Sequence, residues 1–305
     1  MESYALLKYV QEYQYAEDFL AGRLFMNTLG YFWDEEKLKR PIPLADLKED
    51  VPGQNDMLEG AYCYGDPRRL GLPDDFVDHM AADVILRAKG YRYCNLFCCC
   101  KLDYSAGNLG DGHCRIEWDE TRIMKEFGKY VIIIDDVREF EKRVDRAMRR
   151  ERFTYLCGSV KYRKFKHNGA DVDLGHHVML RAENYVVDVN DETLRNAVEG
   201  NFDSFSKMDT MAYQNEWRIS LYRGKKDTVP YVLNLGCRLD DIAHAVMVEE
   251  MIDAVNTDFR QGKFKLEPQY KWYGNVDRGD LRKKFYALGD CQAEMLAVVG
   301  QSRKV

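Results

Sequence analysis

The sequence predicts an α+β fold, and three observations support that class. Strand-like runs are interspersed irregularly with helix-like stretches, so the chain does not repeat strand–helix–strand units. It contains neither a glycine-rich dinucleotide fingerprint nor a phosphate loop of the G-x-x-x-x-G-K-[ST] type. Its composition, with 46% hydrophobic and 12% aromatic residues in 305, is that of a chain that packs a sizeable core.

The N-terminal segment has the clearest local pattern. An apolar run over residues 4–10 predicts a strand, residues 15–21 predict a helix, and residues 24–28 predict a second strand. Gly22 follows the helix-like stretch directly and is the residue expected at a left-handed helix end.

The middle of the chain predicts a buried sheet covered by a helix. The run over residues 95–100, which includes three consecutive cysteines, and the run over residues 130–134 are both continuously apolar, as interior strands are. The stretch that follows has apolar residues at helical spacing, which predicts a helix packed on the sheet. These inward positions are Val137, Phe140, Val144, Ala147 and Met148.

Towards the C-terminus the sequence predicts strands over residues 185–189 and 213–222, and a helix over residues 241–256. No linker rich in Pro, Gly or Ser divides the chain. We therefore expect an α+β core domain over residues 1–235 and a mostly helical extension over residues 236–305 packed on it, with one domain overall favoured over two independent ones.

Composition excludes some classes of function. The formal net charge is −6, so a basic face for non-specific duplex binding is not expected. The start lacks a signal peptide and no apolar window is long enough to span a membrane, which predicts a cytoplasmic protein without membrane contact. The nine cysteines lack C-x-x-C spacing, so no metal is expected at them.

The most informative stretch is residues 211–222. In a strand, alternate side chains share a face, so Met211, Tyr213, Trp217, Ile219 and Leu221 would point one way. The opposite face would present Gln214, Glu216, Arg218 and Ser220. A carboxylate beside a carboxamide on one face suits stabilisation of a cationic sugar transition state. The alternative is an exposed, salt-bridged surface.

Four short motifs carry a resemblance to a known family. They are Lys8-Tyr9, Gly22-Arg23-Leu24-Phe25-Met26-Asn27-Thr28, Asn55-Asp56-Met57-Leu58-Glu59 and Gln214-Asn215-Glu216-Trp217-Arg218. Their order resembles an uncharacterised bacterial domain family with an Asn-Asp-x-x-Glu loop and a late Glu-x-Glu-x-Arg strand. More distantly, the layout is similar to the ADP-ribosyltransferase superfamily. The resemblance implies a mixed, mostly antiparallel split sheet with flanking helices.

The resemblance also implies roles in binding NAD as a co-substrate. Glu216 would hold the nicotinamide ribose and stabilise its oxocarbenium character, while Gln214 would face the acceptor. Asn27 or Thr28 would support Glu216, and Lys8 would reach a phosphate or ribose. Tyr9 and Arg218 complete the implied NAD-binding set. The chain departs from the superfamily in having Lys8 in place of Arg or His and no serine in Met26-Asn27-Thr28.

The acidic loop has two interpretations. Asn-Asp pairs are common in turns for their local backbone hydrogen bonds, which favours a structural role. Asn55, Asp56 and Glu59 are alternatively a substrate lid or a base, because long loops often carry function.

The leading expectation is NAD-dependent transfer of ADP-ribose to a protein or nucleic-acid acceptor, or NAD hydrolysis, by a toxin or phage-conflict effector. A regulatory or inhibitory protein partner would fit such an effector. One alternative is a metal-dependent nuclease or nucleotide hydrolase using Asp56, Glu59 and Asp135. Another is a non-catalytic sensor or partner-binding protein with a degenerate site.

Overall fold

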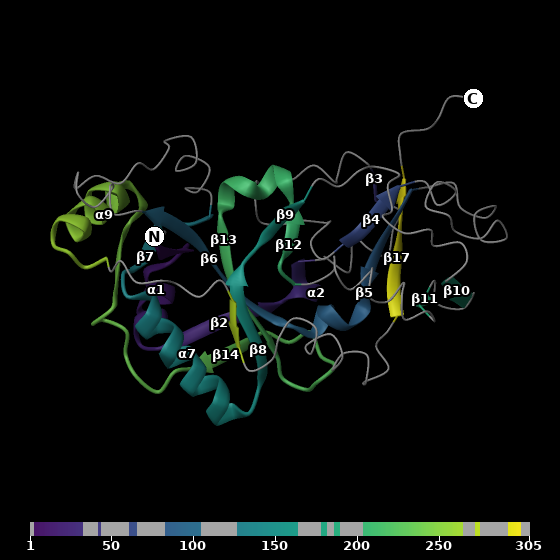
Figure 1. The fold of residues 1–305 in the computed structure, drawn as a ribbon, viewed down its shortest axis with the longest axis horizontal. Coiled ribbons are helices and arrows are strands. Elements are labelled where there is room, and N and C mark those ends of the chain that lie inside the picture. Colours follow the sequence, from purple (N-terminus) through teal and green to yellow (C-terminus); the bar gives the residue numbers. More distant parts are fainter. Residues whose placement is uncertain are drawn as a thin grey trace.

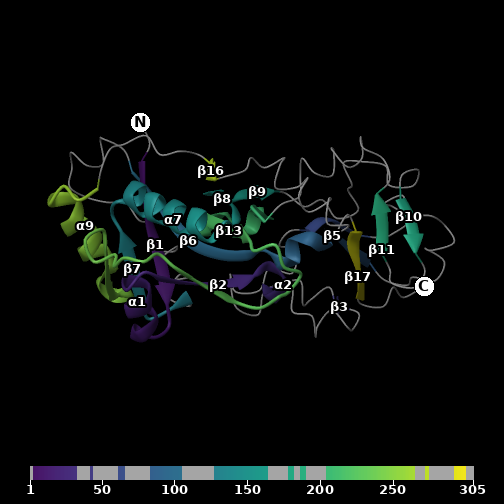
Figure 2. The same ribbon diagram turned by 90° about the horizontal axis from the view of Figure 1, so that it is seen from below.

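The computed structural model describes residues 3–32, 42–43, 61–65, 83–104, 127–163, 178–181, 186–189, 204–264, 272–274 and 292–299. Two sheets lie side by side along the long axis of the molecule (Figures 1 and 2). The larger sheet is flanked by helices α1 (Tyr13–Leu20), α7 (Val137–Glu151) and α9 (Met251–Arg260). The described residues therefore form the α+β, mostly antiparallel architecture that the sequence predicts.

The larger sheet holds the candidate site. Along its main path the strand order is β15 (Ala243–Met247), β7 (Tyr130–Ile134), β1 (Ser3–Val10), β6 (Asn95–Tyr104), β13 (Glu216–Tyr222), β8 (Thr154–Ser159) and β16 (Trp272–Gly274). A side branch adds β2 (Arg23–Thr28), which pairs with β6, and β14 (Tyr231–Asn234), which pairs with β2. Neighbouring strands in this sheet are antiparallel.

Strand β6 is the long central strand of this sheet. One of its edges pairs with β13 from Asn95 to Cys100. Its other edge pairs with β2 at Asn95 and Leu96, and with β1 from Cys100 to Tyr104. Strands β1 and β2 therefore share one edge of β6 and separate around Cys98.

Alternation along the strands separates two apolar cores. On one face, Leu6, Phe97 and Trp217 pack with α1, α7, β2 and β14. On the other face, Leu7 and Val131 of the sheet pack with Val255 of α9. Trp217, Ile219 and Leu221 all lie in the first core, as their spacing predicts.

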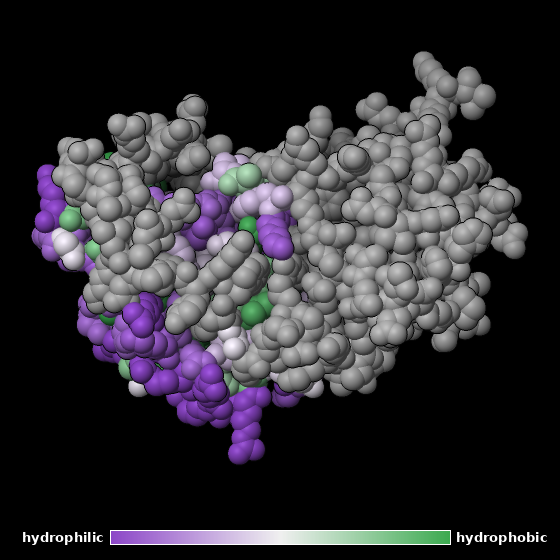
Figure 3. All heavy atoms as spheres, in the orientation of Figure 1, coloured by the Kyte–Doolittle hydropathy of each residue, from purple (hydrophilic) through white to green (hydrophobic). Residues whose placement is uncertain are grey.

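Helices α1 and α7 match their predicted patterns. Gly22 ends α1 with φ +81°, and a Cβ there would lie 2.1 Å from the carbonyl oxygen of Cys237, so glycine is required. Helix α7 buries the whole predicted stripe. Its N-cap is Asp136, whose side chain accepts a hydrogen bond from the Glu139 amide. Figure 3 shows a hydrophilic surface over the outer side of this helix.

The smaller sheet and a separate strand pair contain the remaining described strands. The smaller sheet runs β10 (Val178–Arg181), β11 (Val186–Val189), β17 (Gln292–Val299), β5 (Asp83–Ala88) and β4 (Ala61–Gly65), with β3 (Ile42–Pro43) beside β17. The separate pair is β9 (Lys161–Arg163) with β12 (Ser206–Met208), in parallel. Short helices are α2 (Leu29–Phe32), η2 (Lys89–Tyr93), η4 (Asp209–Gln214) and η5 (Val248–Glu250).

Two sequence predictions need correction here. The helix predicted over residues 241–256 is wrong for its first half, because Ala243–Met247 forms edge strand β15 along β7 and the helix begins at Met251. The extension predicted as mostly helical also contributes β16 and β17. The domain boundary at residue 235 stays a prediction. None of the helices in the described ranges has the length and apolar character that crossing a membrane requires.

Candidate functional site

Strand β13 is buried on both of its faces. Its apolar side chains enter the first core, and its polar side chains face away from that core. Glu216 is 6% exposed and Arg218 is 1% exposed. The exposed, salt-bridged surface considered from sequence is therefore wrong, because this ion pair is shielded from water.

The strand begins later than predicted. Residues 209–214 form the 3₁₀ helix η4, so Gln214, Met211 and Tyr213 are not on β13. Asn215 joins the two elements with φ +40°, a left-handed conformation that asparagine tolerates. Its side-chain amide donates to the carbonyl oxygen of Lys101 at 3.0 Å, which fixes the turn against β6.

Two cations and a thiol surround the Glu216 carboxylate. Arg218 donates from Nε to Oε1 of Glu216 at 2.7 Å, and its Nη2 lies 2.7 Å from the same oxygen. Lys207 Nζ lies 3.2 Å from Oε2 and also donates to the Oε1 of Gln214 at 2.8 Å. The Cys98 thiol adds a hydrogen bond to the carboxylate. Lys207 thus links the two residues predicted to be catalytic, Gln214 and Glu216, although they lie on different elements.

These partners decide the ionisation of Glu216. Burial by itself raises the pKa of its carboxyl, because a charge loses its hydration. The charges of Arg218 and Lys207, with the hydrogen bonds from Cys98 and Arg218, outweigh burial and lower that pKa to about 2. Glu216 is therefore an anion at neutral pH, held in place on both oxygens.

The β9–β12 pair positions Lys207 over β13. Lys207 lies on β12 opposite Tyr162 of β9. The Tyr162 hydroxyl accepts a hydrogen bond from the Glu216 amide at 2.7 Å, and Val160 donates to the Glu216 carbonyl at 2.8 Å. Arg218 also donates from Nη1 to the carbonyl oxygen of Ser204 at 2.5 Å, just before β12. The polar face of β13 is thus covered by an arch made of β12 and η4.

A cavity of about 280 Å³ opens beside this cluster. Its described lining residues combine cations, one carboxylate, a carboxamide and aromatic rings. The lining residues used below are Lys8, Lys207, Arg218, Glu216, Gln214, Tyr9, Tyr31, Phe32 and Phe127. Among the described lining residues the cations outnumber the anions, so the cavity favours a negatively charged ligand.

Strand β1 places two of the predicted NAD-binding residues in the cavity wall. Lys8 donates from Nζ to the carbonyl oxygen of Cys98 at 2.9 Å, where β1 and β2 separate. Its Nζ also lies 4.9 Å from the centroid of the Phe97 ring, a cation–π distance. The Tyr9 hydroxyl contacts the Met251 sulfur at 3.2 Å. Lys8, Tyr9 and Arg218 are thus brought to the same cavity as Glu216 and Gln214.

Strand β2 carries Asn27 and Thr28, the other two residues predicted from the resemblance to contribute to NAD binding. Thr28 is buried and donates to the carbonyl oxygen of Thr228 at 3.3 Å, while accepting from the Tyr31 amide at 3.2 Å. Asn27 pairs with Leu96 of β6. These contacts do not join either residue to Glu216, and neither lines the cavity among the described residues.

The predicted acidic loop lies outside the described residues, so Asn55, Asp56 and Glu59 stay predictions. Asp135 of the metal-dependent alternative is described, and it lies at the end of β7. Its neighbours are His244 and Asp258, so it belongs to a different part of the sheet from Glu216.

The three consecutive cysteines alternate between faces, as predicted for a strand. Cys99 is packed in the first core, whereas Cys98 and Cys100 pair across from Arg218 and Glu216. Burial raises the pKa values of the Cys99 and Cys100 thiols, with the Glu216 charge adding to the effect. Both stay as neutral thiols at physiological pH, which favours a packing role.

No protein-family model, curated protein or solved structure matches this chain. The geometry of the cavity is therefore the basis for a functional assignment. The resemblance to the ADP-ribosyltransferase superfamily and the expectation of NAD without a metal stay predictions.

Sequence reasoning missed Lys207 and Tyr162. Lys207 is 4% exposed, yet its sequence neighbours give no sign that a lysine there is buried. Tyr162 lies 54 residues before Glu216 in the sequence. Lys207 is only seven residues before Gln214, but it reaches Gln214 and Glu216 because β12 and η4 fold back over β13. Polar residues at alternate positions on a strand were the available signal, which marked Gln214, Glu216, Arg218 and Ser220 but neither Lys207 nor Tyr162.

Proposed function

We propose that this cavity binds NAD and that Glu216 assists cleavage of its nicotinamide–ribose bond, giving ADP-ribosyl transfer or NAD hydrolysis. One observation carries the proposal, namely a buried carboxylate with a pKa of about 2 in the wall of a cavity that is otherwise cationic and aromatic. An anion fixed in advance at such a position stabilises a developing positive charge without reorganising.

The cavity chemistry supports a ligand that is both anionic and ring-bearing. Lys8, Lys207 and Arg218 suit a pyrophosphate, since lysine and arginine are the usual phosphate partners. Tyr9, Phe32 and Phe127 offer apolar faces for a planar ring or a ribose. The volume is near the lower end of the roughly 300–1,000 Å³ of ligand pockets, which fits the nicotinamide and ribose half of the dinucleotide.

The proposed step uses two residues of the chain. The bond between ribose C1′ and the nicotinamide nitrogen breaks, and its electron pair goes to nicotinamide, which leaves neutral. Glu216 stabilises the positive charge that develops on the ribose ring. An acceptor nucleophile, or water, then forms a bond to C1′ and loses its proton. Gln214, held 2.8 Å from Lys207 Nζ, orients that acceptor.

The finer points of this proposal follow from the sequence. We propose that the larger sheet is of the ADP-ribosyltransferase-like split type, and the observation that motivates this is the separation of β1 and β2 along β6 at the cavity. We further propose a protein or nucleic-acid acceptor, a cytoplasmic location and a role as a toxin or phage-conflict effector.

The test is release of nicotinamide from NAD by the purified chain, measured by chromatography. Glu216→Gln should lower the rate by about 10²–10³-fold, because it removes the charge and keeps the shape. Gln214→Ala should shift the products from acceptor modification towards free ADP-ribose. Ser220→Ala is the matched control on the same strand face, since Ser220 is buried and hydrogen-bonded to Ser204 at 2.7 Å outside the cavity.

Loss of fold must be separated from loss of chemistry. Glu216→Gln leaves two cations without their carboxylate, so each variant is assayed at a temperature where circular dichroism shows it to be folded. Full activity in folded Glu216→Gln, or no nicotinamide release by the wild-type chain with added acceptor extracts, would refute the proposal.

A further inference from the structure

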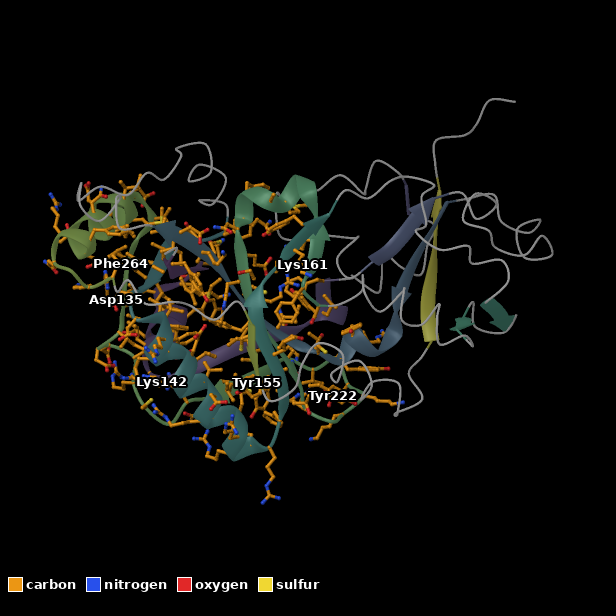
Figure 4. The ribbon with its side chains drawn as sticks, in the orientation of Figure 1. Asp135, Lys142, Tyr155, Lys161, Tyr222 and Phe264 are labelled. Carbon is orange, nitrogen blue, oxygen red and sulfur yellow. The ribbon has the colours of Figure 1, made fainter. Side chains whose placement is uncertain are left out.

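A second cluster of polar side chains lies at the β15 edge of the larger sheet, away from the interior strand β13. Asp135 follows β7, His244 lies on edge strand β15, and Asp258 lies near the end of α9. One ligand atom from each of the three lies within 4.8 Å of the others. Figure 4 shows Asp135 on the α9 side of the molecule.

The sheet fixes two of these residues. Asp135 donates its backbone amide to the carbonyl oxygen of Ile242 at 3.1 Å, which ties the end of β7 to the start of β15. His244 pairs with Ile133 in the β15–β7 ladder. The third residue, Asp258, is delivered by α9, which packs over this face of the sheet. Three separate elements therefore converge on one point.

One oxygen in this cluster lacks a hydrogen bond. Asp258 is 2% exposed, and its Oδ2 is buried with no hydrogen-bond partner among the described residues. Its Oδ1 is 2.7 Å from Lys263 Nζ, and His244 Nε2 lies 3.3 Å from Oδ2 without completing a hydrogen bond. A buried carboxylate oxygen without a partner is costly, so a cation between Oδ2 and its neighbours would offset that cost.

The ionisation states are also compatible with a cation. The pKa of Asp135 is raised to about 6, mainly by burial and secondly by the charge of Asp258. Burial lowers the pKa of His244, with Asp258 opposing and Lys263 assisting that shift. A neutral imidazole is the form that binds metals, and a bound cation would relieve the repulsion between the two carboxylates.

We propose that Asp135, His244 and Asp258 form a binding site for a divalent transition-metal ion, with Zn²⁺ preferred. One nitrogen and two oxygen ligands suit Zn²⁺, leaving a position for water. Two ligands on a tetrahedral zinc lie about 3.4 Å apart, which the 3.3 Å between His244 Nε2 and Asp258 Oδ2 already matches. The widest separation, within 4.8 Å, would contract by at most about 1.4 Å.

This site is distinct from the cavity beside Glu216. Strands β7, β1 and β6 lie between β15 and β13, and a spacing of about 4.8 Å per strand separates them by roughly 19 Å. The metal would join the end of β7, an edge strand and α9. Its predicted effect is thus on the stability of that edge, independently of NAD chemistry.

The test is calorimetric titration of the full chain with Zn²⁺ after chelator treatment under reducing conditions. His244→Gln and Asp258→Asn should each weaken binding by at least about 10-fold, the loss typical of disrupted metal sites. Asp253→Asn, an exposed change on the same helix, is the matched control and should leave the affinity unaltered. Equal affinity in all four proteins would overturn the proposal.

Lys263 provides a test with an opposite sign. Its ammonium competes for Asp258, and it is 41% exposed and able to move away. Lys263→Gln should therefore tighten Zn²⁺ binding, whereas a simple ion-pair network predicts a less stable protein with no change in affinity. Co²⁺ identifies the ligands: a nitrogen and oxygen spectrum supports the site, and a thiolate charge-transfer band would place the metal on cysteines and refute it.

Discussion

Two buried glutamates on opposite sides of the larger sheet have pKa values that are shifted in opposite directions. Glu216 is 6% exposed and its pKa is lowered to about 2. Glu141 of α7 is 5% exposed and its pKa is raised to about 8 by burial, which the hydrogen bond from Tyr4 and the charge of Arg138 only partly offset. The two carboxyls have nearly the same burial, so burial does not explain the difference.

Counter-charges explain it. Glu216 has Arg218 and Lys207 within 3.2 Å of its carboxylate oxygens, together with a thiol. Glu141 instead lies in an apolar core and accepts from the Tyr4 hydroxyl at 3.4 Å. The first residue is kept as an anion next to a cavity, and the second is kept largely neutral within packing. The comparison distinguishes a carboxylate suited to chemistry from one suited to structure.

The largest expected effect comes from removing the main cation at Glu216. Arg218→Met should lower the free energy of unfolding by about 3–5 kcal/mol, because it leaves a buried carboxylate with one partner fewer. The pKa of Glu216 should rise as well, since burial then meets less opposition. Urea unfolding gives the stability, and carbon NMR of the carboxyl gives the pKa.

The dependence of the free energy of unfolding on pH in the acidic range gives the sign of this effect. In the wild type the folded pKa of Glu216 is below its ordinary value of 4.5, so its contribution is complete above that pH and is lost as pH falls towards 2. In Arg218→Met the folded pKa of Glu216 lies closer to 4.5 or above it, so this acid-induced loss should be smaller and end at higher pH, or disappear. The double variant with Glu216→Gln should recover part of the lost stability; no recovery would mean that the cost comes from packing alone.

The sequence predicted the parts of the fold that depend on local patterns. The run Tyr130–Ile134 became β7 with the same bounds, and Asp135 and Asp136 follow directly where its apolar residues end. The helical stripe of α7 was also predicted correctly. The prediction failed at residues 243–247, where apolar spacing suited a helix but β7 paired with the segment as an edge strand. Tertiary pairing overrode the local preference there.

Only part of the candidate site could be predicted, because the rest depends on tertiary folding and not on local spacing. Alternation marked Glu216 and Arg218 as polar partners behind Trp217, and that arrangement is present. The burial of Glu216 and Arg218 could not be predicted from the sequence, because it depends on β12 and η4 folding over the strand. Lys207 comes from that same arch, and no local spacing relates it to Glu216.

A smaller effect of the opposite sign is expected at the second glutamate. Glu141→Gln should raise the free energy of unfolding at pH 7 by roughly 1–3 kcal/mol, because it removes a carboxyl that burial penalises when charged. In the wild type the folded state holds its proton more tightly, so stability should fall as pH rises from 4.5 to about 8. The variant should lack this slope. Unfolding midpoints of both proteins measured from pH 4.5 to about 8 test whether Glu141 causes this slope. A destabilised variant with an unchanged slope would show that Glu141 is ionised in the folded protein.

The smallest effect is expected for an exposed ion pair with the same geometry as the buried one. Arg149 Nε lies 2.8 Å from Asp145 Oδ2 on the outer side of α7, against 2.7 Å between Arg218 Nε and Glu216 Oε1, but the Arg149 side chain is 65% exposed. Water and salt screen this pair, and holding two long side chains in place costs entropy, so its net contribution is small. Arg149→Met should therefore leave the urea midpoint unchanged within error at moderate ionic strength, although it removes the same guanidinium as Arg218→Met. A loss as large as that of Arg218→Met would mean that bond geometry sets the strength of these pairs. The difference in ionisation between Glu216 and Glu141 would then need an explanation other than shielded counter-charges.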